Sequence, residues 1–297
     1  MSESRPSVDI VVPFKGDTAR LHDLAVGLSR VELRDGDSLL IVDNTPGEGR
    51  DRTLHAPEIQ TPGYARNRGA AEGAAEWLVF IDADVTPAPD LLDRYFEPHP
   101  AEETALLAGG IADEPVPPGG PPAARYAYIR GFMSQEDTLR FGEWAFPKTA
   151  NAAVRRTAFE AVGGFRDEAR AAEDADLTYR LKAAGWAMER REQAGVVHHN
   201  RQTVLGFVRQ KLNHGAGGAW LERRHPGASP RRRLPGLTWW GLRTASKGLV
   251  GAARARDRDR ALWALLEPLE LIVHELGRWL PNERRSAGAG GRRPGRG

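Results

Sequence analysis

The stretch Trp77-Leu78-Val79-Phe80-Ile81-Asp82-Ala83-Asp84-Val85, in which an apolar run ends in two carboxylates, decides the fold of this chain. Five consecutive apolar residues are typical of a strand buried on both faces of a parallel sheet. Because an isolated carboxylate is costly to bury, Asp82 and Asp84 are expected where the strand leaves the sheet, at the edge where open α/β sheets bind ligands. Such a pair can bind a hard divalent cation, and a strand-end turn built on aspartate is the alternative.

Strands and helices alternate on the N-terminal side of this stretch. The expected elements are strands at residues 8–12 and 38–42 and helices at residues 18–30 and 62–76. This alternation predicts an α/β fold with a mostly parallel sheet, flanked by helices and joined by right-handed crossovers. Each of the three strands is followed by polar residues, including Lys15 and Asp43, so one sheet edge should form a cleft of nucleotide size.

A second acidic cluster, Glu173-Asp174-Ala175-Asp176-Leu177, begins a predicted helix that stops at Gly185. Carboxylates in a first helical turn are favoured by the helix dipole, so helix capping and a functional carboxylate are both open interpretations. A predicted strand over residues 186–197 then ends in His198-His199.

The composition is that of a soluble globular protein, with 297 residues, 40% of them hydrophobic and 28% charged. The absence of cysteine excludes disulfides, thiolate metal sites and cysteine nucleophiles, and it fits a reducing compartment. The N-terminal residues lack the apolar run of a secretory signal, and no apolar run of about 18 residues predicts a transmembrane helix. We therefore expect a cytoplasmic protein.

Charge is distributed unevenly along the chain. Residues 1–200 contain 22 Lys and Arg against 33 Asp and Glu, whereas residues 201–260 contain 14 against 3. An acidic body followed by a basic segment indicates two tasks, such as a metal site and the binding of an anionic surface or substrate.

The C-terminal third is predicted to be helical. A helix over residues 202–221 should be weak in its second half, because glycines recur between residues 215 and 218. An amphipathic helix follows at residues 262–280, and Pro268 should kink it or begin a second helix. Between them, Trp239 and Trp240 lie among arginines.

These basic helices either pack on the body of the protein or lie in a membrane interface, as a peripheral protein on the inner face of the cell membrane would. An anionic membrane surface is therefore a candidate partner, whereas nucleic acid is not expected, because no recognition motif is present. We divide the chain into a domain at residues 1–222, a basic, aromatic-containing helical appendage at residues 223–285, and a tail at residues 286–297 that is expected to be disordered.

Taken in order, the motifs resemble family 2 inverting glycosyltransferases with the GT-A fold, a Rossmann-like sheet, over roughly residues 6–222. The segments that carry the resemblance are Val11-Val12-Pro13-Phe14-Lys15, Val42-Asp43-Asn44, Gly63-Tyr64-Ala65-Arg66-Asn67-Arg68-Gly69, Phe80-Ile81-Asp82-Ala83-Asp84, Asn151-Ala152-Ala153-Val154-Arg155-Arg156, Gly163-Gly164-Phe165, Glu173-Asp174-Ala175-Asp176-Leu177, His198-His199-Asn200 and the stretch from Arg209 to Gly215.

The resemblance implies a nucleotide-diphospho-sugar donor and a binding site for it. The residues implied in donor binding are Pro13, Asp43, Asn67, Asp82 and Glu173. Among them, Asp43 would accept a hydrogen bond from the base.

The resemblance also implies a metal ion and a catalytic base. The implied metal ligands are Asp84, Asp82 and His198. Oxygen ligands favour Mg²⁺ or Mn²⁺ on the diphosphate, and a histidine ligand shifts the preference toward Mn²⁺. Asp174 would be the catalytic base, with its pKa raised by the neighbouring Glu173 and Asp176.

One departure from the family pattern bears on the reaction. Processive members carry a Gln-x-x-Arg-Trp motif, whereas the corresponding helix here reads Arg209-Gln210-Lys211-Leu212-Asn213-His214, and no flanking transmembrane helix is predicted. The sequence therefore predicts a single addition to an acceptor hydroxyl. The acceptor itself stays open, and a lipid-linked acceptor is one of the candidates.

Two other functions compete with this interpretation. A sugar nucleotidyltransferase needs a glycine-rich basic loop after the first strand, but Pro13-Phe14-Lys15-Gly16-Asp17-Thr18 has one glycine and one lysine. A non-catalytic carbohydrate- or lipid-binding module would keep its biological activity when Asp174 is replaced by asparagine.

Overall fold

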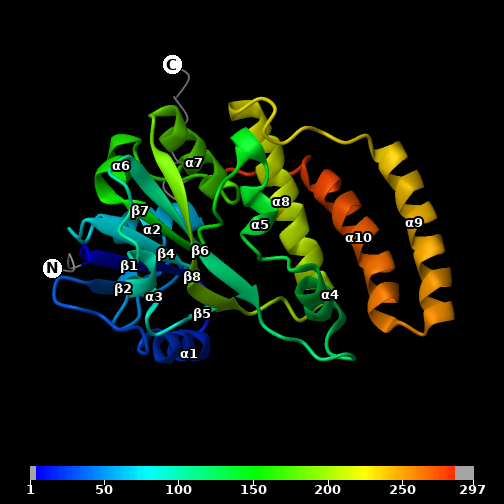
Figure 1. Ribbon diagram of the computed structural model, residues 1–297, viewed down its shortest axis with the longest axis horizontal. Coiled ribbons are helices and arrows are strands. Elements are labelled where there is room, and N and C mark those ends of the chain that lie inside the picture. The colour runs from blue at the N-terminus through cyan, green and yellow to red at the C-terminus, as the bar shows by residue number, and fades with distance from the viewer. Residues whose placement is uncertain (1–4, 285–297) are drawn as a thin grey trace, which may run out of the picture.

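One sheet of eight strands runs through the part of the chain that the computed structural model describes, residues 5–284 (Figure 1). The strands are β1 (Val8–Phe14), β2 (Ser38–Asp43), β3 (Leu54–His55), β4 (Trp77–Ile81), β5 (Val85–Pro87), β6 (Thr104–Asp113), β7 (Asn151–Arg155) and β8 (Ala187–His198). Their order across the sheet is β3-β2-β1-β4-β7-β6-β8-β5. β1 pairs in parallel with both β2 and β4, as the predicted βαβ units require.

Helices cover both faces of the sheet. They are α1 (Thr18–Leu28), α2 (Pro62–Ala70), α3 (Leu91–Tyr95), α4 (Pro122–Arg130), α5 (Glu136–Leu139), the 3₁₀ turn η1 (Gly142–Trp144), α6 (Arg156–Ala161), α7 (Glu173–Ala183), α8 (Val204–Arg224), α9 (Leu234–Ala255) and α10 (Arg258–Gly277). Apolar residues of α1 and α3 belong to one buried cluster, and those of α2, α6 and α7 belong to another on the opposite face. The predicted α/β class is therefore confirmed.

β4 is buried on both faces, as its composition predicts. Trp77, Val79 and Ile81 point into one core cluster, while Leu78 and Phe80 point into the other. All five side chains are fully buried. The apolar run can continue without alternation because each face of the strand meets its own layer of helices.

The sheet is mixed beyond β4. β7 lies antiparallel between β4 and β6, and β5 pairs antiparallel with β8, so three of the seven strand pairs are antiparallel. The predicted helix over 62–76 also ends early, at Ala70. The residues after it turn into β4 instead, and the backbone N–H of Ala75 donates to the Asp9 carboxylate at 2.9 Å.

The C-terminal helices differ from expectation in two places. α8 continues through its glycines to Arg224, because these glycines allow α10 to approach: a Cβ at Gly215 would overlap the carbonyl oxygen of His274. α10 runs through Pro268 without a second helix beginning there. α10 packs on α8 and α4, and α9 packs on the outer side of α10, at one end of the molecule (Figure 1).

The domain boundary placed at residue 222 falls in the last turn of α8, two residues before the helix ends. The predicted disordered tail, residues 286–297, lies outside the described residues. Among the helices that are described, none combines the length and the apolarity needed to cross a membrane.

Candidate active site

The carboxylates that follow β4 and those that begin α7 line one cavity of about 1150 Å³. Five of the residues predicted for the site lie on its wall: Asp82, Asp84, Glu173, Asp174 and His198. Most of the remaining wall comes from the segment that contains α5, from α8 and α10, and from the loop between α8 and α9. Acids that are about 90 residues apart in the chain therefore face the same space.

Arg66, on α2, joins the two groups of acids. Its Nη2 donates to Asp82 at 2.5 Å, and its Nη1 donates to Glu173 at 2.7 Å. The Arg66 side chain is 3% exposed and the Glu173 side chain 7% exposed, whereas Asp82 keeps 32% of its surface. Asp82 is thus oriented by an arginine, and Glu173 is neutralised by it.

Asp174 lies beside this ion pair and forms no ion pair of its own with any residue between 5 and 284. Its Oδ1 accepts a hydrogen bond from the backbone N–H of Ala175 at 2.8 Å. Burial, and next the charge of Glu173, raise the pKa of Asp174 to about 7, although Arg66 acts in the opposite direction. A carboxylate with a pKa near neutrality can accept a proton from a substrate hydroxyl.

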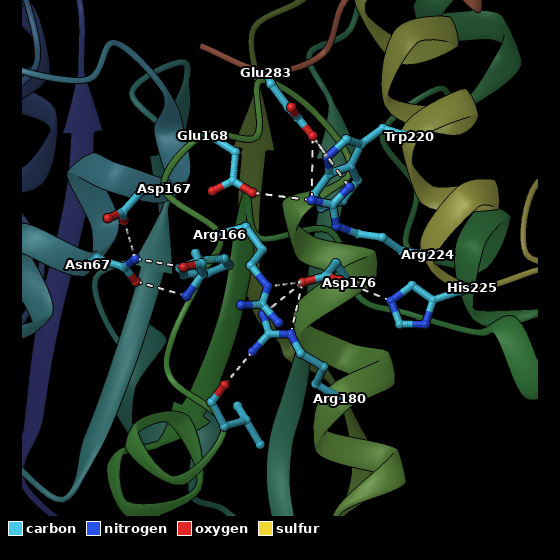
Figure 2. A network of polar contacts seen from close by, with 12 residues as sticks. Asn67, Arg166, Asp167, Glu168, Asp176, Arg180, Trp220, Arg224, His225 and Glu283 are labelled. Carbon is cyan, nitrogen blue, oxygen red and sulfur yellow. Dashed lines mark hydrogen bonds and ion pairs between the residues drawn. The ribbon is translucent and has the colours of Figure 1, made fainter. Parts of the chain in front are cut away.

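Asp176 is not among the main causes of this shift, although the sequence predicts that it contributes. Asp176 does not line the cavity, and Figure 2 shows it between Arg180 and His225. Its carboxylate accepts a hydrogen bond from Arg180 at 2.9 Å and lies 2.9 Å from Nε2 of His225. The periodicity of the helix explains the difference, because residues two apart on a helix lie on different faces.

Asp84 and His198 lie close together, the first just beyond the C-terminal end of β4 and the second at the C-terminal end of β8. Nε2 of His198 lies 3.7 Å from Asp84, Nδ1 lies 3.6 Å from Asp113, and Arg201 reaches the second oxygen of Asp84 at 3.0 Å. Burial would lower the pKa of His198, but Asp113 and Asp84 outweigh it and raise that pKa to about 9. Burial likewise opposes ionisation of Asp84, but His198 and Arg201 together lower its pKa.

The donor atoms at this point fit a divalent cation. Nε2 of His198 and the Asp84 carboxylate oxygen, 3.7 Å apart, can both reach one ion at bond lengths of about 2.0–2.2 Å. A complete cluster of three acidic or histidine ligands is not assembled within residues 5–284. Of the three implied ligands, Asp84 and His198 meet, while Asp82 is directed to Arg66.

Pro13 and Asp43 lie at the same sheet edge but outside the lining of the cavity. The fully buried Asp43 carboxylate forms an ion pair with Arg50 at 2.7 Å and accepts a hydrogen bond from the backbone N–H of Thr45 at 3.0 Å. Arg50 in turn donates to the carbonyl of Gly16 at 2.8 Å. These residues form a polar cluster of their own beside the cavity.

Asn67 joins two segments of the fold. Its amide nitrogen donates to the Phe165 carbonyl at 2.8 Å and to the Asp167 carboxylate at 2.7 Å, and its oxygen accepts from the backbone N–H of Phe165 at 2.9 Å (Figure 2). The side chain does not line the cavity. Its hydrogen bonds attach α2 to the loop that leads to α7.

The C-terminal residues after α10 hold the same loop from the other side. The backbone N–H of Arg170 donates to Asn282 at 2.9 Å, and the side-chain amide of Asn282 donates to the carbonyl of Ala171 at 3.0 Å. Glu283 accepts a hydrogen bond from Trp220 at 3.1 Å, as Figure 2 shows. The chain thus returns from its C-terminal helices to support the residues that precede Asp174.

The sequence analysis gave no role to several cations of the cavity wall, among them Arg66, Lys148 and Lys211. Nζ of Lys148 donates to the carbonyls of Phe132 and Ser134, and burial lowers the pKa of this lysine to about 8. Lys211 forms a buried ion pair with Glu270 at 2.7 Å. Arg66 and Lys211 lie inside segments that carry the family resemblance, but no local signal marks Lys148, because its partners are backbone carbonyls distant in sequence.

Known proteins support the family assignment. A sequence profile described as "Glycosyl transferase family group 2" matches residues 77–266. The pre-mycofactocin glycosyltransferase of Mycobacterium tuberculosis is 28% identical over 257 residues, which cover 83% of this chain and 54% of that protein. The succinoglycan biosynthesis protein ExoA of Rhizobium meliloti is 26% identical over 247 residues, which cover 77% of this chain and 72% of ExoA. The chain thus spans about half the length of the mycobacterial relative.

The fold also has a solved counterpart. The mannosyltransferase PcManGT from Pyrobaculum calidifontis, determined in complex with GDP-Man and Mn²⁺, superposes with a TM-score of 0.63 at 17% identity, covering 93% of this chain and 88% of that one. This likeness concerns the fold, and it confirms the GT-A type that the motifs predict. Because the family profile covers more than half of the sequence, this chain belongs to glycosyl transferase family group 2.

Proposed function

We propose that this protein transfers a sugar from a nucleotide-diphospho-sugar to an acceptor hydroxyl, with inversion at the anomeric carbon. The observation that carries the proposal is Asp174, a carboxylate with a pKa of about 7 that faces the same cavity as the acids after β4. Two relatives are named a pre-mycofactocin glycosyltransferase and a succinoglycan biosynthesis protein, and these names support the same class of reaction.

The proposal of inversion is supported by the chemistry that these residues offer. The attacking hydroxyl must lose its proton as it bonds to the anomeric carbon, and Asp174 is the proposed acceptor of that proton. A positioned base of this kind contributes about 10²–10⁴-fold to the rate. One displacement by the acceptor needs no nucleophile from the protein, which is compatible with the absence of cysteine.

Asp84 and His198 are the residues that would hold a divalent metal, with Asp82 beside them. Such an ion supplies positive charge where the diphosphate leaving group gains negative charge. PcManGT was determined with Mn²⁺, and a mixed carboxylate and imidazole set suits Mn²⁺ better than Mg²⁺. Arg66 holds Asp82 and Glu173 in place around this point.

Single addition and a membrane-derived acceptor remain parts of this proposal. The cavity wall contains Phe132, Phe141 and Trp144 together with several arginines, which suits an acceptor that has both an apolar part and an anionic part. A location on the inner face of the cell membrane, in the cytoplasm, is proposed on the same ground.

The test is donor turnover by the purified protein with UDP-, GDP- and dTDP-sugars in the presence of Mn²⁺. Asp174→Asn should reduce turnover about 10²–10⁴-fold while the nucleoside diphosphate still binds, as a thermal-shift titration would detect. Full turnover by this variant would remove Asp174 from its role. Undiminished turnover in excess EDTA would show that the metal assignment is wrong.

A further inference from the structure

Helix α9 has one covered face and two open faces. Its covered face is made of small residues that approach α10: Gly241 lies against Pro268, and Gly248 lies against Ala264. Close approach through small side chains fastens α9 to the rest of the protein along a narrow strip. Most of the surface of this 22-residue helix therefore remains exposed, at the outer end of the molecule (Figure 1).

One open face is apolar. Trp239, Leu242, Leu249 and Val250 recur at helical spacing and are 67%, 63%, 36% and 51% exposed. Side chains of this size are rarely exposed together on a single helix face unless something covers them. We call these four residues the apolar face of α9.

The other open face is basic. Arg243, Lys247 and Arg254 share it, all three are exposed, and none has a carboxylate partner within residues 5–284. No acidic residue occurs anywhere between Arg231 and Arg256. We call these three cations the basic face of α9, and it lies directly beside the apolar face around the helix.

Exposed apolar side chains also follow the end of α10. Trp279 and Leu280, just after α10, are 71% and 45% exposed, and the guanidinium of Arg231 lies 5.3 Å from the centre of the Trp279 ring. Arg231 and Arg232 also line the cavity, and α9 begins two residues later. The start of α9 is therefore two residues along the chain from the cavity wall.

We propose that α9 lies flat on an anionic lipid bilayer, with its apolar face inserted among the acyl chains and its basic face against the lipid headgroups. Adjacent apolar and basic faces are the arrangement that places a helix in a bilayer interface, where tryptophan is also favoured. A bilayer needs no matching shape, which suits a convex single helix better than a protein groove would. The complementary charge comes from the basic segment, since the rest of the protein is acidic.

The test is co-sedimentation of the full chain with phosphatidylglycerol vesicles and with phosphatidylcholine vesicles. We expect binding to phosphatidylglycerol that weakens as salt is raised, and little binding to phosphatidylcholine. The variant R243Q/K247Q/R254Q should bind phosphatidylglycerol about 100-fold more weakly, at about fivefold for each cation removed. W239A/V250A should lose at least about tenfold, because it removes apolar surface that the bilayer would bury.

Matched controls carry the same chemical changes elsewhere. R20Q/R30Q/R68Q removes three exposed arginines from the acidic body, and V26A/L33A truncates two apolar side chains that are 47% and 46% exposed. Both controls should sediment like the unaltered protein. No residue of either α9 variant lines the cavity, so donor turnover in solution is a separate measurement that can fail or succeed independently.

Three results would overturn the proposal: no sedimentation of the unaltered protein with phosphatidylglycerol, undiminished binding by both α9 variants, or an equal loss in the controls. Sedimentation equilibrium adds a fourth. If the unaltered protein is a dimer that W239A/V250A converts to a monomer, the apolar face binds a second copy of the chain and not a bilayer. Melting temperatures equal to that of the unaltered protein would exclude misfolding as the cause of lost binding.

Discussion

Arg66 and Glu173, 107 residues apart in the sequence, form a buried ion pair in which Nη1 lies 2.7 Å from Oε1. The pair connects α2 to the first turn of α7 and stands next to Asp174. Because the same guanidinium also holds Asp82, one arginine sets the relative positions of the acids after β4 and the acids of α7.

Arg66→Gln should strongly destabilise the protein. The substitution leaves Glu173 buried without a counter-charge, which costs about 3–5 kcal/mol in comparable buried pairs. Thermal and urea denaturation would measure the loss in free energy of unfolding. Arg68→Gln is the matched control, because Arg68 is exposed on the same helix, and it should change stability by less than about 0.5 kcal/mol. Equal stability of both variants would contradict the role given to Arg66.

The pH dependence of turnover should report Asp174. A base works only when it is deprotonated, so kcat/KM should fall about tenfold per pH unit below the pKa of about 7. If kcat/KM stayed constant down to pH 5, a group other than Asp174 would be the base that removes the proton.

The free energy of unfolding should also depend on pH through Asp174, in a direction that the raised pKa determines. The pKa of Asp174 is about 7 in the folded protein and 3.8 in a free carboxyl. Between these two pH values the folded state therefore binds more protons than the unfolded chain. The contribution of Asp174 to stability is therefore present at low pH and is lost as the pH rises toward 7. Asp174→Asn should flatten this part of the curve of unfolding free energy against pH, and an unchanged slope would argue against the raised pKa.

Replacing Asn67 separates structural support from donor binding. Asn67→Ala removes three hydrogen bonds and leaves backbone groups of the 165–167 loop unpaired, at a cost of about 1–3 kcal/mol. If Asn67 only supports the fold, the melting temperature should fall while the Kd for a nucleoside diphosphate stays constant. If Asn67 also contacts the donor, as the family resemblance implies, that Kd should rise. Asp167→Asn keeps an acceptor for Asn67 and should have the smaller effect.

Metal binding should depend on Asp84. Asp84→Asn should weaken Mn²⁺ binding, measured in the presence of nucleoside diphosphate, by at least about tenfold. Asp90→Asn, at an exposed ion pair with Arg94 on α3, is the charge-matched control and should bind Mn²⁺ normally. Equal Mn²⁺ affinity in the two variants would place the ion elsewhere.

The local sequence pattern was sufficient to predict an element whose two faces have the same kind of surroundings. The apolar run of β4 identifies a strand buried on both faces, because helices cover both sides of the sheet along its whole length. The acids after that strand could be placed at the ligand-binding edge for the same reason, since charge is excluded from the strand itself. The GT-A type followed from the order of motifs, not from any single one.

Pairings between distant segments could not be read in this way. Nothing near β7 shows that it runs antiparallel between β4 and β6, and nothing near Gly215 shows that α10 would pack against it and keep α8 helical. The direction in which a carboxylate points was equally hidden: Asp174 faces the cavity, whereas Asp176 faces Arg180 and His225.

The sequence by itself determined the main strands and helices around the site, such as β1, β2, β4 and α7, and which acids lie at the edge of the sheet, because those properties depend on neighbours along the chain. Only the tertiary structure decided that Arg66 orders these acids, that Asn282 supports the loop before Asp174, and that α9 keeps two faces open. Ion pairs and packing depend on which distant residues meet, and the local pattern of residues does not encode that meeting.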